Sequence, residues 1–127
     1  MNLPERNFSY HKLTAYQKAR ELILLIYKIT KDYPKEEQFS LVTQMRRAVV
    51  SIVANIVEGY SKKSTKEYSR FLDIAIGSST ELKVFLEISS DLKYLTTETY
   101  TKADNLLTEI RKLLYTYKKS LRNRVEG

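Results

Sequence analysis

The feature that most constrains this chain is the spacing of its apolar side chains, which recur every three or four residues through most of its 127 positions. The most regular series is Tyr100, Ala103, Leu107, Ile110, Leu114, Tyr117 and Leu121. Residues at this spacing lie on one face of an α-helix, whereas a half-buried strand requires alternation. A helix with one apolar face buries it against other elements, and the chain offers no hairpin or sheet pattern for that purpose. We therefore expect an all-α fold.

Four helical segments can be recognised, at about 13–33, 38–60, 65–93 and 97–122. Pro34 ends the first, because proline cannot continue a helix. The second contains the β-branched run 49–57, but its apolar residues keep the helical spacing and no second strand is available to pair with it. The short connections favour an up-down-up-down antiparallel four-helix bundle, in a single domain over residues 1–127.

Local signals mark where several of these helices begin and end. Gly59 is placed to act as the C-cap of the second helix. Ser64 and Glu67 have the spacing of a capping box, in which the serine hydroxyl accepts a hydrogen bond from the backbone N–H of the glutamate. Thr96 and Thr97 are the N-cap candidates for the fourth helix.

The first helix has a wider apolar face than one position in a bundle requires. Beside the stripe that contains Ala19 and Ile26, a second row is formed by Leu22, Leu25 and Ile29. An apolar sector of this width predicts a second partner surface, such as another copy of the chain.

The composition leaves few residues for catalysis. Cysteine is absent, which excludes disulfides, cysteine-ligated metals and thiolate nucleophiles. His11 is the only histidine, and the three glycines do not form a phosphate-binding loop. We expect no enzyme, no catalytic residue, no cofactor and no metal. Since no long apolar run or signal-peptide pattern occurs, we also expect a cytoplasmic protein that does not enter a membrane.

The net charge of +7 comes from 22 Lys and Arg residues against 15 Asp and Glu residues. Such an excess favours a polyanionic partner, but basic surface residues also keep a bundle in solution, and both interpretations stay open. The basic residues cluster after the second helix and in the last helix. The candidate nucleic-acid-binding residues are Lys62, Lys63, Lys66, Arg111, Lys112, Lys118, Lys119, Arg122 and Arg124.

The second helix carries a row of polar residues at helical spacing, unlike the rest of its surface. The row consists of Gln44, Arg47, Ser51, Asn55 and Glu58. It is either a solvated face or a network buried between helices or subunits. For the network, the expected partners on the third helix are Glu67, Arg70, Ser78 and Glu81, with the ion pairs Glu58 with Arg70 and Arg47 with Glu81. Such buried pairs fix register more than they add stability.

The chain has ten tyrosines and no tryptophan, a composition that could indicate stacking on nucleic-acid bases. Six of the tyrosines fall on the apolar stripes, which favours a place in the core instead. These are Tyr16, Tyr27, Tyr33, Tyr68, Tyr100 and Tyr117.

Two stretches carry a resemblance to a known family. The stretch at 44–59 reads QMRRAVVSIVANIVEG, and the stretch at 71–82 reads FLDIAIGSSTEL. The chain resembles the bacterial four-helix-bundle proteins related to those encoded in intervening sequences of large-subunit rRNA genes. Val53, Tyr16 and Val57 stand where that family often has proline, tryptophan and alanine. The family implies a four-helix bundle without an established biochemical activity.

The chain is also similar to the accessory variability determinant of diversity-generating retroelements, a basic pentameric bundle that binds nucleic acid and a reverse transcriptase. This similarity implies a homopentamer, with RNA, DNA, a reverse transcriptase or another protein as partners. We therefore expect an oligomeric bundle that binds RNA or DNA through phosphate contacts without reading sequence. The alternative is a protein-interaction scaffold that has no nucleic-acid role.

Overall fold

The computed structural model describes the backbone of residues 9–126 and the side chains of residues 9–124. Four α-helices account for most of this part of the chain: α1 Thr14–Thr30, α2 Leu41–Tyr60, α3 Thr65–Asp91 and α4 Thr97–Glu126. Two short 3₁₀ turns, η2 Tyr10–Lys12 and η3 Lys35–Glu37, precede α1 and α2. The described residues contain no strand, and the all-α prediction is confirmed.

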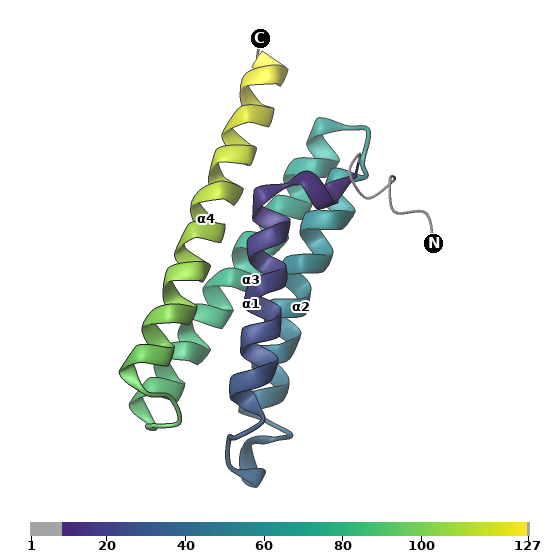
Figure 1. Ribbon diagram of the computed structural model, residues 1–127. Coiled ribbons are helices and arrows are strands. Elements are labelled where there is room, and N and C mark those ends of the chain that lie inside the picture. The colour runs from purple at the N-terminus through teal and green to yellow at the C-terminus, as the bar shows by residue number, and fades with distance from the viewer. Residues whose placement is uncertain (1–8, 127) are drawn as a thin grey trace.

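The helices form an antiparallel bundle in which successive helices run in opposite directions (Figure 1). Each helix packs against the next one along the chain, and α1 also packs against α4 to close the arrangement. The predicted up-down-up-down bundle is therefore the observed one. The first helix ends three residues earlier than expected, because the chain turns at Lys31 to Tyr33 before Pro34.

The core draws on all four helices. Ala103, Leu107, Ile110 and Leu114 of the predicted α4 stripe are at most 1% exposed. The most deeply buried large side chains on the other helices are Leu22, Ile26, Met45, Ile52, Ile56, Leu72, Leu82 and Leu86. In α1 the buried face includes Leu22 of the second apolar row, and Leu24 remains 64% exposed. Leu25 and Ile29 of that row are half-buried, and Leu24 belongs to neither predicted row.

Gly59 is not the C-cap that the sequence suggested. It lies inside α2, which continues to Tyr60, and it has no positive φ. A Cβ atom at this position would lie 2.9 Å from Cβ of Phe71 on α3. Glycine is therefore required here because α2 and α3 approach closely, and not because the helix ends.

Two predicted caps are present. The Oγ atom of Ser64 accepts a hydrogen bond from the backbone N–H of Glu67, with 3.3 Å between the two atoms. At the start of α4, Oγ1 of Thr96 accepts from the backbone N–H of Thr99 at 3.1 Å. Each bond gives an acceptor to a backbone N–H group that the first turn of a helix leaves unpaired.

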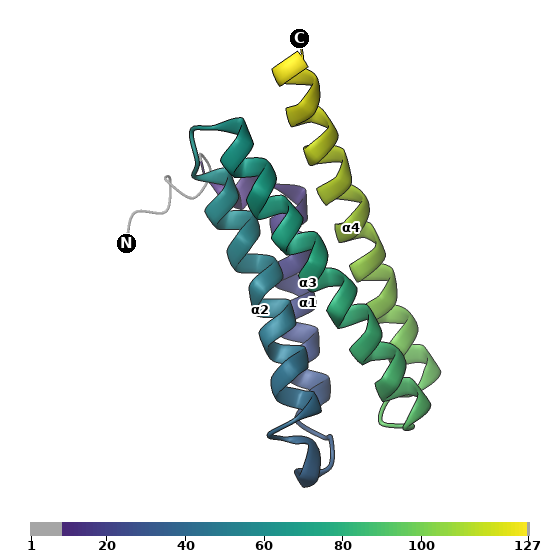
Figure 2. The same cartoon turned by 180° about the vertical axis from the view of Figure 1, so that it is seen from behind.

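The turns between the helices lie at the two ends of the bundle, and the candidate site lies at one of these ends. The turn between α2 and α3, the start of α1 and the end of α4 lie at one end (Figures 1 and 2). The turns between α1 and α2 and between α3 and α4 lie at the other. At the first end the last turns of α4 project past the neighbouring helices.

Candidate nucleic-acid interface

The net charge of the described residues is concentrated at one end of the bundle. We call the end formed by residues 9–22, 51–77 and 112–124 the basic end, and the half formed by residues 23–50 and 78–111 the neutral end. The basic end holds twelve Lys and Arg residues against four Asp and Glu residues, an excess of eight. The neutral end holds nine of each kind. The fold therefore gathers the whole positive excess in one half.

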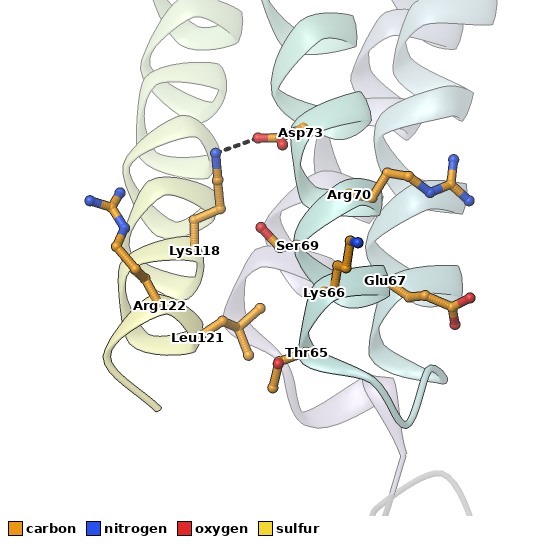
Figure 3. A pocket seen from close by; sticks show the side chains of 9 residues that line it. All are labelled: Thr65, Lys66, Glu67, Ser69, Arg70, Asp73, Lys118, Leu121 and Arg122. Atoms are coloured by element: carbon orange, nitrogen blue, oxygen red, sulfur yellow. Dashed lines mark ion pairs between the residues drawn. The ribbon is translucent and has the colours of Figure 1, made fainter. Parts of the chain in front are cut away.

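A groove lies at the basic end between the start of α3 and the end of α4 (Figure 3). It has a volume of about 880 Å³. Its lining residues are Thr65, Lys66, Glu67, Ser69, Arg70, Asp73, Lys118, Leu121 and Arg122. The groove brings Lys66 from one predicted basic segment together with Lys118 and Arg122 from the other. Arg70 and Asp73, which the sequence did not mark for binding, complete it.

The cations of the groove differ in how far they are already neutralised. The Nζ atom of Lys118 lies 2.5 Å from Oδ1 of Asp73, so this ammonium has a carboxylate partner on α3. Lys66 and Arg122 are exposed and form no ion pair with the described residues. Figure 3 shows Arg122 and Arg70 extending away from each other on opposite sides of the groove. Lys66 and Arg122 are thus the cations best placed to meet an added anion.

Arg111 has a structural role that its sequence position did not reveal. Its Nη1 atom donates hydrogen bonds to Oγ of Ser79 at 2.9 Å and to Oγ1 of Thr80 at 2.7 Å, both on α3. These bonds hold the guanidinium against α3 at the neutral end. Arg111 therefore fixes the register of α3 and α4, and its planar head is turned toward protein groups.

The other predicted cations are spread over the surface. Nζ of Lys62 lies 3.2 Å from Oε1 of Glu58 and 5.4 Å from the centre of the Phe71 ring. Lys63 and Lys112 are exposed. Lys119 and Arg124 are exposed and flank a shallow hollow on the outer face of α4.

The polar row of α2 forms a network only at its centre. The hydroxyl oxygens of Ser51 and Ser78 are hydrogen-bonded at 2.7 Å, which joins α2 to α3. Nδ2 of Asn55 donates to the backbone oxygen of Ser51 at 2.8 Å and to its Oγ at 3.1 Å. Ser51 and Asn55 are half-buried, and Ser78 is buried.

The two predicted ion pairs of that network are wrong. Several residues of the predicted network are exposed to solvent: Gln44, Arg47, Glu58, Arg70 and Glu81. Within residues 9–124 no ion pair joins α2 to α3. The reason is that small residues bring these helices too close to hold long charged side chains between them, and water solvates the charges at the flanks at no desolvation cost. The guanidinium of Arg70 lies instead 4.7 Å from the centre of the Phe71 ring.

The tyrosines of the apolar stripes are mostly in or beside the core. Tyr33 is 5% exposed, and Tyr16, Tyr68, Tyr100 and Tyr117 are half-buried. Burial, followed by repulsion from neighbouring tyrosines, raises the pKa of Tyr68 to about 12, so its hydroxyl stays neutral. Tyr27 differs from the prediction, because it is exposed and lies beneath the guanidinium of Arg46, 4.5 Å from the ring centre.

Two further observations bear on the class of site. Among residues 9–124 no group of three or more His, Cys, Asp or Glu side chains is arranged to hold a metal ion. None of the described helices combines the length and the apolar character needed to cross a bilayer.

These features define the class of protein as an all-α four-helix bundle whose net positive charge lies at one end. The chain belongs to the 23S rRNA-intervening sequence protein family, whose model matches residues 11–116. A solved structure from Bacteroides thetaiotaomicron, described as a protein of unknown function from the S23 ribosomal protein family, is similar to this chain. The two are 31% identical with a TM-score of 0.77, over 83% of this chain and 95% of the other. Comparison with the curated proteins finds no match.

Proposed function

We propose that this protein is a non-enzymatic, cytoplasmic binding protein whose basic end holds RNA or DNA through contacts to phosphates. The observation that carries the proposal is the excess of eight positive charges in one half of the described chain beside a balanced other half. A cationic surface of this kind attracts a polyanion and releases the counterions condensed on it. Contacts to phosphates carry no sequence information, so the proposed binding is non-specific.

The groove supports the proposal because it offers cations on two helices. Lys66 on α3 and Arg122 on α4 can contact the same phosphate chain from opposite sides. Leu121, 4% exposed, and Thr65 lie between the helices.

We further propose that the protein acts as a homopentamer, as the similarity to the retroelement protein implies. Exposed apolar side chains support assembly: Leu24 is 64% exposed on α1, and Val84 and Ile88 are 44% and 39% exposed on α3. Five copies with a net charge of +7 would carry +35 in total. Many weak phosphate contacts would then act together. The same apolar residues favour the alternative, a scaffold for a reverse transcriptase or another protein.

Salt-dependent binding tests the nucleic-acid proposal. We expect the affinity for a labelled 20-nucleotide strand, measured by fluorescence anisotropy, to fall steeply as the salt concentration rises. The double variant Lys66→Glu/Arg122→Glu should bind at least about ten-fold more weakly, with a salt slope smaller by about one or more. Lys31→Glu/Lys35→Glu at the neutral end is the matched control, since it makes the same change in net charge and should lose much less.

Two outcomes would contradict the proposal. If wild-type protein binds neither RNA nor DNA at low salt, the scaffold is the better interpretation. If both double variants weaken binding equally, net charge alone matters and the basic end is not the binding surface. Light scattering tests the assembly, because a mass near the 14.9 kDa of one chain at micromolar concentration would exclude the pentamer.

A further inference from the structure

We propose that the ligand of the basic end is a single-stranded polynucleotide, one base of which stacks on the ring of Tyr115. The inference rests on the proposed nucleic-acid function and adds the class of ligand and a contact to a base. It starts from the environment of this tyrosine, which lies outside the apolar stripes of the sequence.

Tyr115 is the tyrosine with the largest exposed fraction among the exposed large hydrophobic residues, at 52%. Its ring stacks on no other described aromatic ring and lies under no described cation. The other two exposed tyrosines have partners: Tyr60 packs edge-on against Tyr68, and Tyr27 lies beneath Arg46. Tyr115 is therefore about half exposed, and its ring takes part in no stacking or cation–π contact within the described part of the chain.

Basic residues surround Tyr115 on the same side of α4. Arg111 precedes it by four residues, and Lys118 and Arg122 follow it by three and seven, so that all four lie along one helix face. Both Arg111 and Lys118 contact α3, which shows that this face looks toward α3. At a rise of 1.5 Å per residue, Arg122 lies about 10 Å along the axis from Tyr115. The ring thus continues the line of cations that leads into the groove.

The register of α3 against α4 shows which part of α3 lies opposite the ring. Arg111 contacts Ser79 and Thr80, and Lys118 contacts Asp73, so the antiparallel register sets Tyr115 against the Ala75 to Ile76 step of α3. Gly77 is exposed, and a Cβ atom placed on it would meet nothing within 4 Å. The surface of α3 is therefore open at Gly77, one residue beyond the step that faces Tyr115.

Stacking selects a single strand over a duplex. In a duplex the faces of the bases are covered by their neighbours, whereas an unpaired base can leave its stack and lie on an aromatic ring. Proteins that bind single strands combine a cationic groove for the phosphates with an aromatic ring for the bases. The groove and Tyr115 supply these two parts on adjoining turns of α4.

The first test uses fluorescence, because the chain contains no tryptophan. The variant Tyr115→Trp carries a single indole, whose emission should be quenched as dT20 or U20 is added. A blunt 20-base-pair duplex should leave the emission nearly unchanged. Phe39→Trp is the control, since Phe39 is 95% exposed but lies at the neutral end, and its emission should not respond to either ligand.

The second test measures affinity for dT20 and U20. Tyr115→Ala should bind about five-fold or more weakly, while Tyr115→Phe keeps the ring and should bind like wild type. The salt slope should be the same in all three proteins, because no phosphate contact is removed. The comparison of dT20 with U20 decides between DNA and RNA as the preferred strand.

The outcomes separate this inference from the proposed function. If wild-type binding depends on salt but Tyr115→Ala binds as well as wild type, or the indole is not quenched, the stacking inference is wrong and phosphate binding stands. If the duplex binds as tightly as the strand, the single-strand assignment is wrong. If Tyr115→Ala lowers the mass in solution and the indole stays unquenched, Tyr115 is a contact between copies. If no salt-dependent binding occurs at all, the proposed function itself fails.

Discussion

At the scale of single residues, Lys93 stands out because it has a positive φ of 63°. It follows the end of α3 in a Schellman motif, in which the backbone N–H of Tyr94 donates to Ser89 and that of Lys93 to Ser90. This position normally favours glycine, because a Cβ atom is strained there. We expect Lys93→Gly to raise the free energy of unfolding by about 1 kcal/mol, measured by urea denaturation. A loss of stability would contradict this account of the turn.

A second residue-scale feature joins the two turns at the neutral end. The hydroxyl of Tyr94 donates to Oε2 of Glu37 at 2.7 Å, and Oγ of Ser40 donates to Oε1 at 2.9 Å. These bonds, the Tyr94 bond first, hold the pKa of the Glu37 carboxyl below its ordinary value of 4.5. The hydrogen bond to Glu37 also raises the pKa of Tyr94 above 10.0.

The two shifts give opposite pH limits. Because the pKa of Glu37 is lowered, its stabilising effect is present above pH 4.5 and is lost as the pH falls through the lowered value. Because the pKa of Tyr94 is raised, the stabilising effect of its protonated hydroxyl is present below pH 10.0 and is lost as the pH rises through the raised value. We expect the melting temperatures of wild type and Tyr94→Phe to differ most near pH 7 and to converge as the pH falls through the lowered pKa of Glu37. A difference that stays constant from pH 7 to pH 3 would show that the bond does not stabilise the fold.

Caps show which residue-scale features a sequence can reveal. The Ser64 and Thr96 caps were predictable because each side chain bonds a backbone group three residues away. Gly59 was misread because its reason lies on another helix, at Phe71. Tyr115 was missed because its exposure depends on the register of α4 against α3.

At the scale of helices, substitution by alanine should have opposite effects on stability at two glycines. Gly59 lies where α2 meets α3, and an added Cβ would stand 2.9 Å from Cβ of Phe71 and 3.1 Å from Cδ1 of Tyr68. Gly77 lies inside α3 on an open surface. We expect Gly59→Ala to destabilise the protein by about 1–3 kcal/mol through overpacking. Gly77→Ala should stabilise it by about 0.5–1 kcal/mol, because alanine favours the helix.

Thermal and urea denaturation of both variants measure these changes. Equal losses would mean that the space above Gly77 is filled in solution, for instance by another copy of the chain. A neutral Gly59→Ala would mean that α2 and α3 can separate without a penalty.

The positions of the helices followed from the spacing of apolar residues, because burial of a stripe depends on its period, and their alternating direction followed from the short connections. The contacts between helices did not follow. Whether Arg47 meets Glu81 depends on how close α2 and α3 lie, which is set by Ser51, Ser78 and Gly59. Arg111 could not be distinguished from a surface cation without the register that places it on Ser79 and Thr80.

At the scale of the whole molecule, the amount of positive charge is a property of the sequence, but its position is a property of the fold. Three stretches that are far apart in the chain meet at the basic end, and only the alternation of helix direction brings them there. The position of the charge therefore follows mostly from the up-down topology, which the sequence did predict. The groove could not be predicted from the topology alone, since it depends on the spacing of α3 and α4 near Leu121.

The gathered charge makes a prediction about stability. Like charges at the basic end repel one another in the folded state, and dissolved ions screen this repulsion. We expect the melting temperature to rise when sodium chloride is increased from about 20 mM to about 300 mM. The variant Lys66→Glu/Arg122→Glu should rise less than Lys31→Glu/Lys35→Glu, because only the first relieves the repulsion. Identical salt responses would contradict a repulsive basic end.

A bundle that is electrically balanced at one pole and strongly positive at the other has a dipole moment along its long axis. If the protein binds nucleic acid as proposed, the field of the strand would turn this dipole before contact, so that the end of α4 approaches first. Rotational alignment of this kind shortens the search for a productive orientation, which is the step that normally slows protein association below the diffusion limit. In a side-by-side arrangement with all positive poles parallel, the poles would repel one another, and a polyanion lying across them would relieve that repulsion.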